Sequence, residues 1–473
     1  MFFPRARVGK SFFSLAIFVL LPLSVHALEI SGWVPYWRVE QGVQSILPNL
    51  ASFTEVNPFI YTVKSNGALN EASSLTESTW VELRREAKAR NVRLIPTITW
   101  ASPDAIDAVL RDPVKRQAHV QVITREVFAH NMDGIDIDYE GKYAKTRPYF
   151  SLFLKELNES IGFNKWVMCT IEARTPLDSR FATPEDIPKD IEYANDFSEI
   201  NKYCDRVRIM AYDQGRFDLK LNAANSHPYA PVADNAWVEK VMKLAAVDID
   251  TSKLVIGVPT YGYEYDMFTD NGTVQYSRLW SFNPSYAVEL SGKLGIATAR
   301  SPFGEMVLTY PASRAPDGII PLPNATRILF WSDASSVADK AALAKKMGLR
   351  GIAVFKIDGG EDQRIGDVLA QYTEDAVVTK QATPSTQGAG VSLSVPNTDL
   401  EFGMRREEVR VLQKLLNTKG FTIVASGGGS PGNETIYFGP ATRAALIRFQ
   451  KAHGVPATGY FGPKTRATLR ASL

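Results

Sequence analysis

The sequence predicts an α/β fold whose main body is a closed parallel barrel. Eight apolar runs typical of buried strands occur along this body, and segments with apolar residues at steps of three and four residues separate them. Eight strands that alternate with helices fit a closed barrel better than an open sheet. The hydrophobic fraction of 45% excludes global disorder. We therefore expect a (β/α)8 TIM barrel, followed by a small all-α domain.

The first element is expected to be an export signal over residues 1–27. Arg5, Arg7 and Lys10 precede the apolar run SFFSLAIFVLLPLS, and the small-residue pattern VHA ends at Ala27. An uncleaved anchor is the alternative, but the run is shorter than the roughly 20 residues that a spanning helix needs. We expect a secreted protein, extracellular or periplasmic, with no membrane segment after cleavage.

The barrel is expected over residues 28–372. A gap of about 264–329 between the seventh and eighth strands is too long for a loop, and it predicts a small α+β insertion there. Intervening helices are predicted, for example, by the spacing of Val120, Ile123 and Val127. The expected strands are residues 29–37, 53–63, 92–99, 134–140, 166–173, 206–213, 253–262 and 351–359.

The chain contains two cysteines, Cys169 and Cys204. Two cysteines in so long a chain do not make a disulfide framework, so the fold must be held by its core. We interpret both as buried small residues. Whether they pair is left open by the sequence.

The C-terminal part is predicted to be a separate module, residues 398–473, joined by a flexible linker at 373–397 that is rich in Thr, Ser, Gln, Gly and Pro. The sequence YFGPATRAALIRFQ recurs 23 residues later as YFGPKTRATLRASL, and an earlier helix ends at Gly420, which together predict three helices. Leu412, Leu446 and Phe449 are assigned to its core. From Asp399 onward, eleven Lys/Arg face five Asp/Glu, a net charge of +6 that favours an anionic extracellular surface as partner.

The stretch DGIDIDYE, residues 133–140, concentrates four carboxylates in one apolar strand. Side chains alternate along a strand, so Asp136, Asp138 and Glu140 share the inward face, roughly 6.5 to 7 Å apart. Such a group retains a proton near neutral pH, which a general acid for glycosidic bonds requires. A solvated acidic surface would not alternate with isoleucine, and the glycine spacing of a calcium loop is absent. A metal-binding Asp-x-Asp of a sugar-transferring enzyme remains the weaker alternative.

With its neighbours, this stretch resembles the Asp-x-x-Asp-x-Asp-x-Glu signature of glycoside hydrolase family 18. The sequence MAYD, residues 210–213, follows on the sixth expected strand as in that family, and the resemblance covers roughly 29–367. NPFIYTV and RILFWSDASS are similar to the bacterial cell-wall and spore-cortex branch. The tail resembles the three-helix peptidoglycan-binding module over its whole length, which implies that the secreted protein is associated with the cell wall.

The resemblance implies a retaining mechanism without an enzyme nucleophile, in which the 2-acetamido group of the substrate attacks the anomeric carbon. Glu140 would protonate the glycosidic oxygen, and Asp138 would hold the acetamido N–H. Asp136 would share a proton with Asp138, and Tyr212 would donate to the acetamido oxygen. The remaining motif residues, Asp133 and Gly134, are assigned a structural role.

Substrate contacts are expected from residues at strand ends. The matching position for the tryptophan that floors the pocket in most family members is Phe355, whose ring offers a smaller apolar face. The Ser-x-Gly-Gly common on the third strand of many chitinases is missing. Aromatic residues at strand ends can equally pack in the barrel. The candidate contacts are Asp213, Phe355, Met210, Tyr36, Trp33 and Trp331, with Trp100 weighed as well.

No metal or cofactor is expected, because the histidines show no ligand spacing and no glycine-rich phosphate loop follows a strand. Neither nucleic acid nor a second copy of the chain is expected as a partner. We interpret the protein as an exported N-acetylglucosaminidase that cleaves β-1,4 bonds in peptidoglycan. A chitinase or chitin-oligosaccharide hydrolase with the same chemistry, and a non-catalytic glycan-binding protein, are the alternatives.

Overall fold

The computed structural model describes residues 27–162, 164–226, 228–318, 322, 324–381, 395–404, 406–424 and 428–472. The expected export signal therefore lies outside the described residues, apart from Ala27. Most of the expected linker, residues 382–394, lies outside them as well, whereas its first residues, 373–381, form the end of a helix rather than a flexible segment. None of the helices that the structure describes is both long enough and apolar enough to cross a membrane.

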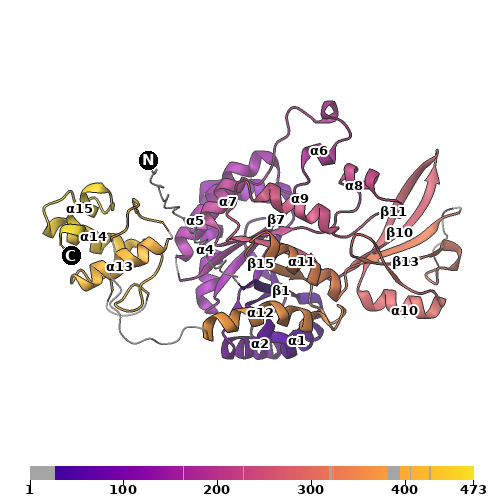
Figure 1. Ribbon diagram of the computed structural model, residues 1–473, viewed down its shortest axis with the longest axis horizontal. Helices are drawn as coiled ribbons and strands as arrows, with labels where there is room; N and C mark the ends of the chain where they lie inside the picture. Colours follow the sequence, from indigo (N-terminus) through magenta and orange to yellow (C-terminus); the bar gives the residue numbers. More distant parts are fainter. Residues whose placement is uncertain are drawn as a thin grey trace, which may run out of the picture.

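The body is the predicted closed barrel of eight parallel strands (Figure 1). Strand β1 pairs in parallel with β2 on one side and with β15 on the other, which closes the sheet. The barrel strands are β1 (Glu29–Pro35), β2 (Glu55–Val63), β5 (Thr97–Trp100), β6 (Gly134–Tyr139), β7 (Trp166–Glu172), β8 (Arg206–Met210), β9 (Leu254–Pro259) and β15 (Gly351–Phe355).

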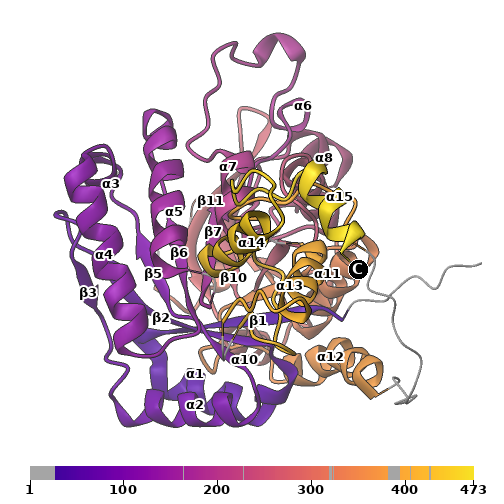
Figure 2. The same ribbon diagram turned by 90° about the vertical axis from the view of Figure 1, so that its left-hand side faces the viewer.

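Helices surround these strands (Figures 1 and 2), and the apolar faces of strands and helices form one continuous core. Val120, Ile123 and Val127 are buried on α4, as their spacing predicts. The helices of the body are α1 (Val39–Ile46), α2 (Ser78–Ala89), α3 (Pro103–Leu110), α4 (Pro113–Ala129), α5 (Arg147–Ile161), α6 (Leu177–Arg180), α7 (Phe197–Tyr203), α8 (Leu219–Ala224), α9 (Asn235–Ala245), α11 (Ala334–Lys346) and α12 (Ile365–Gln381).

The third expected strand is interrupted. The structure has β4 (Arg93–Leu94), a break, and then β5, where one strand over 92–99 was predicted. Pro96 lies in the break, and proline has no N–H to donate to a strand ladder. A short strand β3 (Leu69–Glu71) also pairs antiparallel with the end of β2.

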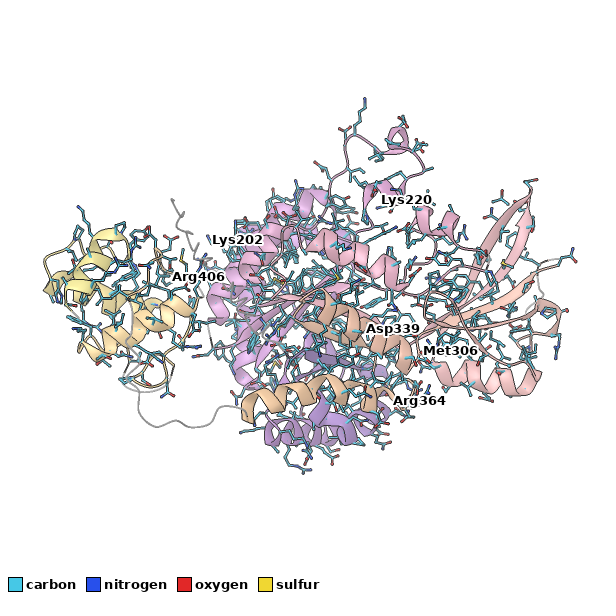
Figure 3. The ribbon with its side chains drawn as sticks, viewed as in Figure 1. Lys202, Lys220, Met306, Asp339, Arg364 and Arg406 are labelled. Atoms are coloured by element: carbon cyan, nitrogen blue, oxygen red, sulfur yellow. A yellow bond between two sulfur atoms is a disulfide. The ribbon has the colours of Figure 1, made fainter. Side chains whose placement is uncertain are left out.

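The predicted insertion between the seventh and eighth barrel strands is a five-stranded sheet with one helix. Its elements run from residue 262 to residue 331, slightly beyond the expected 264–329. Its side chains are drawn in Figure 3, where the label Met306 marks the start of β13. The elements are β10 (Gly262–Asp270), β11 (Thr273–Phe282), α10 (Pro284–Leu294), β12 (Ala299–Arg300), β13 (Met306–Pro311) and β14 (Thr326–Trp331).

The tail contains the three expected helices, α13 (Glu407–Thr418), α14 (Pro440–Ala452) and α15 (Pro463–Ala471). Leu412, Leu446 and Phe449 are fully buried in its core, as predicted. Each copy of the repeated sequence is bound in the same way by one buried glutamine. The Gln413 amide donates to the carbonyl of Tyr437 at 2.8 Å, and Gln450 donates to Tyr460 at 2.9 Å in the second copy.

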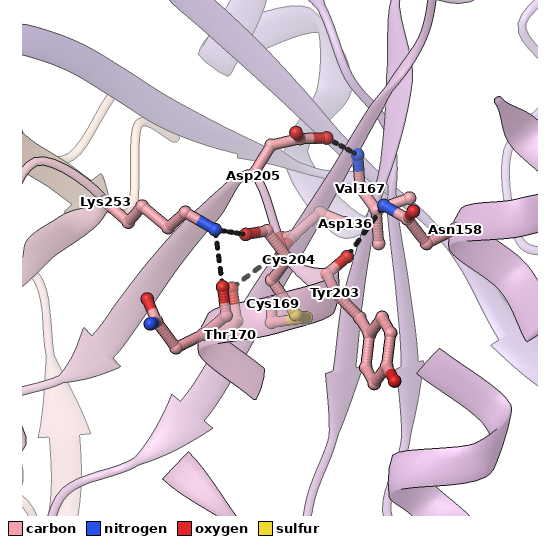
Figure 4. Close-up of a disulfide and its surroundings, with 10 residues drawn as sticks. Asp136, Asn158, Val167, Cys169, Thr170, Tyr203, Cys204, Asp205 and Lys253 are labelled. Carbon is pink, nitrogen blue, oxygen red and sulfur yellow. Dashed lines mark hydrogen bonds between the residues drawn. A yellow bond between two sulfur atoms is a disulfide. The ribbon is translucent and has the colours of Figure 1, made fainter. Parts of the chain in front are cut away.

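Cys169 and Cys204 form a disulfide (Figure 4). Both are buried, as expected, and they are paired, a point that the sequence left open. Cys169 points outward from β7, and Cys204 directly follows α7, with Cα atoms 5.9 Å apart. The bond therefore ties the fifth barrel strand to the helix that leads into the sixth.

Candidate active site

The acidic strand β6 has the two faces that its alternation predicts. Ile135, Ile137 and Tyr139 are fully buried among the helices. Asp136 and Asp138 point into the barrel, where they are nearly inaccessible to solvent. Glu140 directly follows the strand at its carboxyl end, and its N–H donates to the carbonyl of Trp100 at 2.9 Å. The carboxylates thus form a line from the barrel interior to the end where active sites of this fold lie.

Asp136, the deepest carboxylate, is held from three sides. Its oxygens accept hydrogen bonds from the hydroxyls of Thr97 at 2.8 Å and Thr170 at 2.9 Å, and from the Trp33 indole at 3.2 Å. Arg208 Nη1 also lies 2.8 Å from Asp136 Oδ2. Burial raises the pKa of Asp136 to about 6, although the three hydrogen bonds oppose the rise.

Asp138, the next carboxyl along β6, has fewer hydrogen-bond partners than Asp136. It lies opposite Thr99 in the β5–β6 register, yet its buried Oδ1 atom has no hydrogen-bond partner among the described residues. Burial raises the pKa of Asp138 well above its usual range, and the neighbouring carboxyls Glu140 and Asp136 raise it further. A buried carboxyl with a free oxygen is suited to accept a hydrogen bond from a ligand N–H.

Glu140 is partly exposed and has a second carboxylate beside it. Burial raises the pKa of Glu140, Glu172 raises it further, and the Lys142 ammonium opposes both. Burial also raises the pKa of Glu172, but Lys142 and hydrogen bonds from Asn195 and Gly141 outweigh this, so the net pKa is lowered. Glu172 therefore stays ionised next to a Glu140 that keeps its proton to higher pH than an exposed glutamate would.

Glu140 lines a pocket of about 280 Å³, which we call the acid pocket. Met210, Tyr212 and Asp213 of the MAYD sequence line it as well. Burial raises the pKa of Tyr212 well above its usual range, so its hydroxyl remains a hydrogen-bond donor. Asp213, at the edge, accepts a hydrogen bond from the hydroxyl of Tyr263 at 2.9 Å. The acid pocket is lined by Glu140, Glu172, Ala173, Thr175, Arg180, Met210, Tyr212, Asp213, Phe217 and Trp237.

A second pocket of about 430 Å³, which we call the aromatic pocket, adjoins the first. Asp213 lines both pockets. Phe355 lines the aromatic pocket and stacks on Tyr212 of the acid pocket, with ring centroids 5.8 Å apart and an interplanar angle of 17°. The aromatic pocket is lined by Trp37, Arg38, Asp213, Tyr261, Tyr263, Ser281, Phe282, Asn283, Phe355, Lys356 and Asp358.

Two of the tryptophans expected to contact substrate are buried elsewhere. Trp33 is 2% exposed and lies inside the barrel, where its ring packs edge-on against Phe355 and its N–H holds Asp136. Trp331 is also 2% exposed and packs on Phe282 in the core of the insertion. Neither side chain is therefore available to a sugar, because the Trp33 ring is enclosed inside the barrel and the Trp331 ring is enclosed in the core of the insertion. Trp100, at 3% exposed, packs against Tyr139.

Of the two exposed aromatic residues that follow β1, Trp37 lines the aromatic pocket, and sequence reasoning missed it. Tyr36 is 38% exposed and packs edge-on against Trp37, which is 48% exposed and lines the aromatic pocket. Tyr36 was expected to contact substrate because it lies near a strand end, and the strand does end one residue before it, at Pro35. Arg38 and Glu172 were missed as well, since only the meeting of distant strand ends brings them to the site. Lys142 was missed because its ion pair with Glu172 depends on that same meeting.

Asp133 and Gly134 lie at the opposite end of β6. Asp133 Oδ2 accepts a hydrogen bond from the N–H of Leu94 at 2.8 Å, which joins β6 to the neighbouring strand. A Cβ atom at Gly134 would lie 2.2 Å from the carbonyl oxygen of Trp166, so a side chain cannot fit there. Among the residues that the structure describes, no group of three or more His, Cys, Asp or Glu could hold a metal ion.

Two family models match the chain. Residues 32–360 match glycosyl hydrolases family 18, and residues 405–469 match a peptidoglycan binding domain. The Uncharacterized glycosylase YvbX of Bacillus subtilis (strain 168) is 22% identical over 249 residues, which are 52% of this chain and 62% of that protein. The Cortical fragment-lytic enzyme of the same organism is 23% identical over 331 residues, 68% of this chain and 67% of that protein. The chain thus spans about three fifths of the first relative and two thirds of the second.

Solved structures show the same fold. The Bacillus cereus spore cortex-lytic enzyme SleL superposes with a TM-score of 0.57 at 18% identity, covering 73% of this chain and 74% of that one. A chitinase from Chromobacterium violaceum superposes with a TM-score of 0.57 at 18% identity, covering 73% of this chain and 99% of that one.

Proposed function

The chain belongs to family 18 of the glycosyl hydrolases, and on this basis we propose that it is an exported retaining enzyme that hydrolyses β-1,4 bonds of peptidoglycan. The bond cleaved is the one on the reducing side of N-acetylglucosamine, which makes the enzyme an N-acetylglucosaminidase. The observation that carries the proposal is the line of carboxyls from Asp136 to Glu140, whose last member has a raised pKa and lines the acid pocket.

The proposed mechanism uses the acetamido group of the substrate as nucleophile, one of the exceptions to the two-carboxylate scheme. Glu140 gives its proton to the glycosidic oxygen as the bond to the anomeric carbon breaks. The acetamido oxygen attacks that carbon from the opposite face and forms an oxazolinium ion. The ionised Glu140 then takes a proton from a water that attacks the same carbon, which opens the ring and restores the acid.

Asp138 and Tyr212 stabilise the oxazolinium ion in this mechanism. The free Oδ1 atom of Asp138 accepts the acetamido N–H, and its ionised form offsets the positive charge that develops on the ring. The Tyr212 hydroxyl donates to the acetamido oxygen and orients it. Because this chemistry needs an N-acetyl group on the reacting sugar, it limits the substrate to N-acetylated glycans.

Asp136 has a narrower role than proton sharing in this proposal. Its oxygens already accept three hydrogen bonds and face Arg208, and no hydrogen bond joins it to Asp138 among the described residues. Its negative charge raises the pKa of Asp138 from within the barrel. We therefore assign Asp136 to tuning the protonation of Asp138.

Peptidoglycan is favoured over chitin by the C-terminal module. The peptidoglycan binding domain match covers most of the tail, whose net charge of +6 suits an anionic wall. A tethered module raises the local concentration of the barrel at an insoluble polymer without new contacts in the active site. A chitinase is the second candidate, since chitin carries the same reacting sugar.

The test is mass spectrometry of products from purified peptidoglycan and from chitin oligosaccharides. The proposal expects soluble fragments with N-acetylglucosamine at the reducing end, which borohydride reduction labels. Fragments ending in N-acetylmuramic acid would contradict the assigned bond. Cleavage of chitin oligosaccharides alone would favour the chitinase, and binding to both polymers without any cleavage would favour a glycan-binding protein.

A further inference from the structure

The two pockets that meet at Asp213 lie on opposite sides of the reacting sugar, if the proposed function is correct. Glu140 lines the acid pocket, so the leaving sugar, whose oxygen receives the proton, occupies that pocket. The aromatic pocket lies beyond the stacked rings of Tyr212 and Phe355, on the side of the sugar that stays joined to the reacting one. A glycan chain through the site therefore places one neighbouring sugar in each pocket.

Each pocket contains an arginine whose charge is largely free. In the aromatic pocket, Arg38 Nε donates to the carbonyl oxygen of Asp358 at 2.8 Å, which anchors the guanidinium. Its side chain is 42% exposed, and its ion pair with the Asp358 carboxylate is long, at 3.8 Å. The Asp358 carboxylate is buried and already paired with Lys356 and Asn283. The terminal nitrogens of Arg38 thus remain available.

In the acid pocket the corresponding residue is Arg180, the exposed last residue of α6. It forms no ion pair with any residue that the structure describes, and the nearest aromatic ring, that of Phe181, lies 5.9 Å from its guanidinium carbon. None of the three carboxyls that line this pocket pairs with Arg180. Glu172 lies 3.7 Å from the Lys142 ammonium, Asp213 accepts a hydrogen bond from the Tyr263 hydroxyl, and Glu140 holds its proton in the proposed mechanism.

We propose that Arg38 and Arg180 form two subsites for an acidic substituent on the sugars on either side of the reacting N-acetylglucosamine. In a strictly alternating glycan, both neighbours of a given sugar are of the same kind. If the reacting sugar is N-acetylglucosamine, both neighbours in peptidoglycan carry a lactyl ether, whose carboxylate is free once the peptide is removed. A guanidinium binds a carboxylate through two parallel N–H bonds. Chitin has no such group, so the two arginines distinguish peptide-free strands of peptidoglycan from chitin.

A solvated surface arginine is the ordinary alternative, because exposed cations are common and exposed ion pairs contribute little. Two observations favour a binding role here. Both arginines line pockets that adjoin the proposed catalytic residues, and an exposed ring, Trp37, lies next to Arg38 in the chain and lines the same pocket. An aromatic face beside a cation provides a stacking surface for the pyranose ring and a partner for its acidic group.

The experiment compares wild type with Arg38→Gln, Arg180→Gln, the double variant and a matched control, Arg125→Gln, which removes an exposed arginine from α4. Each protein is assayed on peptide-free glycan strands and on the same strands after their carboxyl groups are converted to methylamides. We expect kcat/KM on the acidic strands to fall about tenfold for each single variant and about a hundredfold for the double. On the amidated strands all variants should stay within about twofold of wild type, and the control should match wild type on both.

Equal losses on the two kinds of strand, or no loss on either, would overturn the inference. The proposed function is tested separately, since a wild-type protein that cleaves neither strand contradicts that function alone. In that case dissociation constants decide the inference. With Glu140→Gln as background, the arginine variants should weaken binding to acidic strands about tenfold and leave binding to amidated strands unchanged.

Discussion

The disulfide between Cys169 and Cys204 is expected to contribute a large share of the stability of the barrel. The two cysteines are 35 residues apart, so the bond closes a loop of that length in the unfolded chain. Loop-closure entropy for such a loop corresponds to about 4 kcal/mol at 25 °C. A typical domain is stable by only about 5 to 15 kcal/mol, so the loss should be readily measurable.

The position of the bond suggests how the loss is distributed. The segment that it closes contains the end of β7, α6, α7 and the approach to β8. Its far end is also held by hydrogen bonds, from the N–H of Val167 to Asp205 at 2.9 Å and from Asn158 to the carbonyl of Tyr203 at 2.9 Å (Figure 4). Thr170, next to Cys169, donates to Asp136 from the inward face. These contacts do not depend on the disulfide. We therefore expect the reduced protein to remain folded and active, but with a lower free energy of unfolding.

The assay is urea unfolding of oxidised and thiol-reduced protein, followed by tryptophan fluorescence. All eight tryptophans lie between residues 33 and 331, so the signal reports on the barrel and its insertion. Reduction should lower the free energy of unfolding by about 4 kcal/mol. The Cys169→Ala/Cys204→Ala variant should be destabilised and should not respond to thiol. A change below about 1 kcal/mol on reduction of the wild type would refute the reasoning.

Three further predictions concern the site and its surroundings. Glu172→Gln removes a negative charge that raises the pKa of Glu140, so the alkaline limb of the pH profile of kcat should move to lower pH, and an unmoved limb would count against this coupling. Tyr212→Phe should lower kcat roughly tenfold to a hundredfold without changing the melting temperature, because only the hydroxyl is lost; unchanged kcat would remove it from the mechanism. Burial lowers the pKa of His119 to about 4, so the unfolded chain takes up a proton first as pH falls from 6.5. Relative to His119→Asn, wild type should therefore lose about 3 kcal/mol of unfolding free energy between pH 6.5 and 4, and parallel stability curves would contradict this.

Sequence reasoning reached the barrel because its signals are local. Alternation in β6 placed Asp136 and Asp138 inside and Ile137 outside, and helical spacing identified the buried face of α4. The same reasoning divided the chain at the insertion to within a few residues. It failed at the third strand, where Pro96 breaks the ladder inside a run that is otherwise apolar.

Periodicity predicted the candidate site only along β6, and the resemblance to the family supplied Tyr212, Asp213 and Phe355. Trp33 and Trp331 are aromatic residues near strand ends, but a position near a strand end does not say on which side the ring lies. The side is set by how strands from distant parts of the chain meet, and both rings pack in cores. Arg38, Lys142 and Glu172 were missed for a related reason. Their charges become part of the site only because the fold places them near Glu140 or in one of the two pockets.

The most direct test of the central claim is the turnover of Glu140→Gln on purified peptidoglycan. The control is Asp133→Asn, which changes a carboxyl of the same motif at the opposite end of β6. We predict that Glu140→Gln lowers kcat by about a hundredfold to ten-thousandfold and leaves wall binding and melting temperature unchanged. Asp133→Asn should keep most of its kcat. A Glu140→Gln protein that turns over peptidoglycan as fast as wild type would contradict the assignment of Glu140 as the catalytic acid.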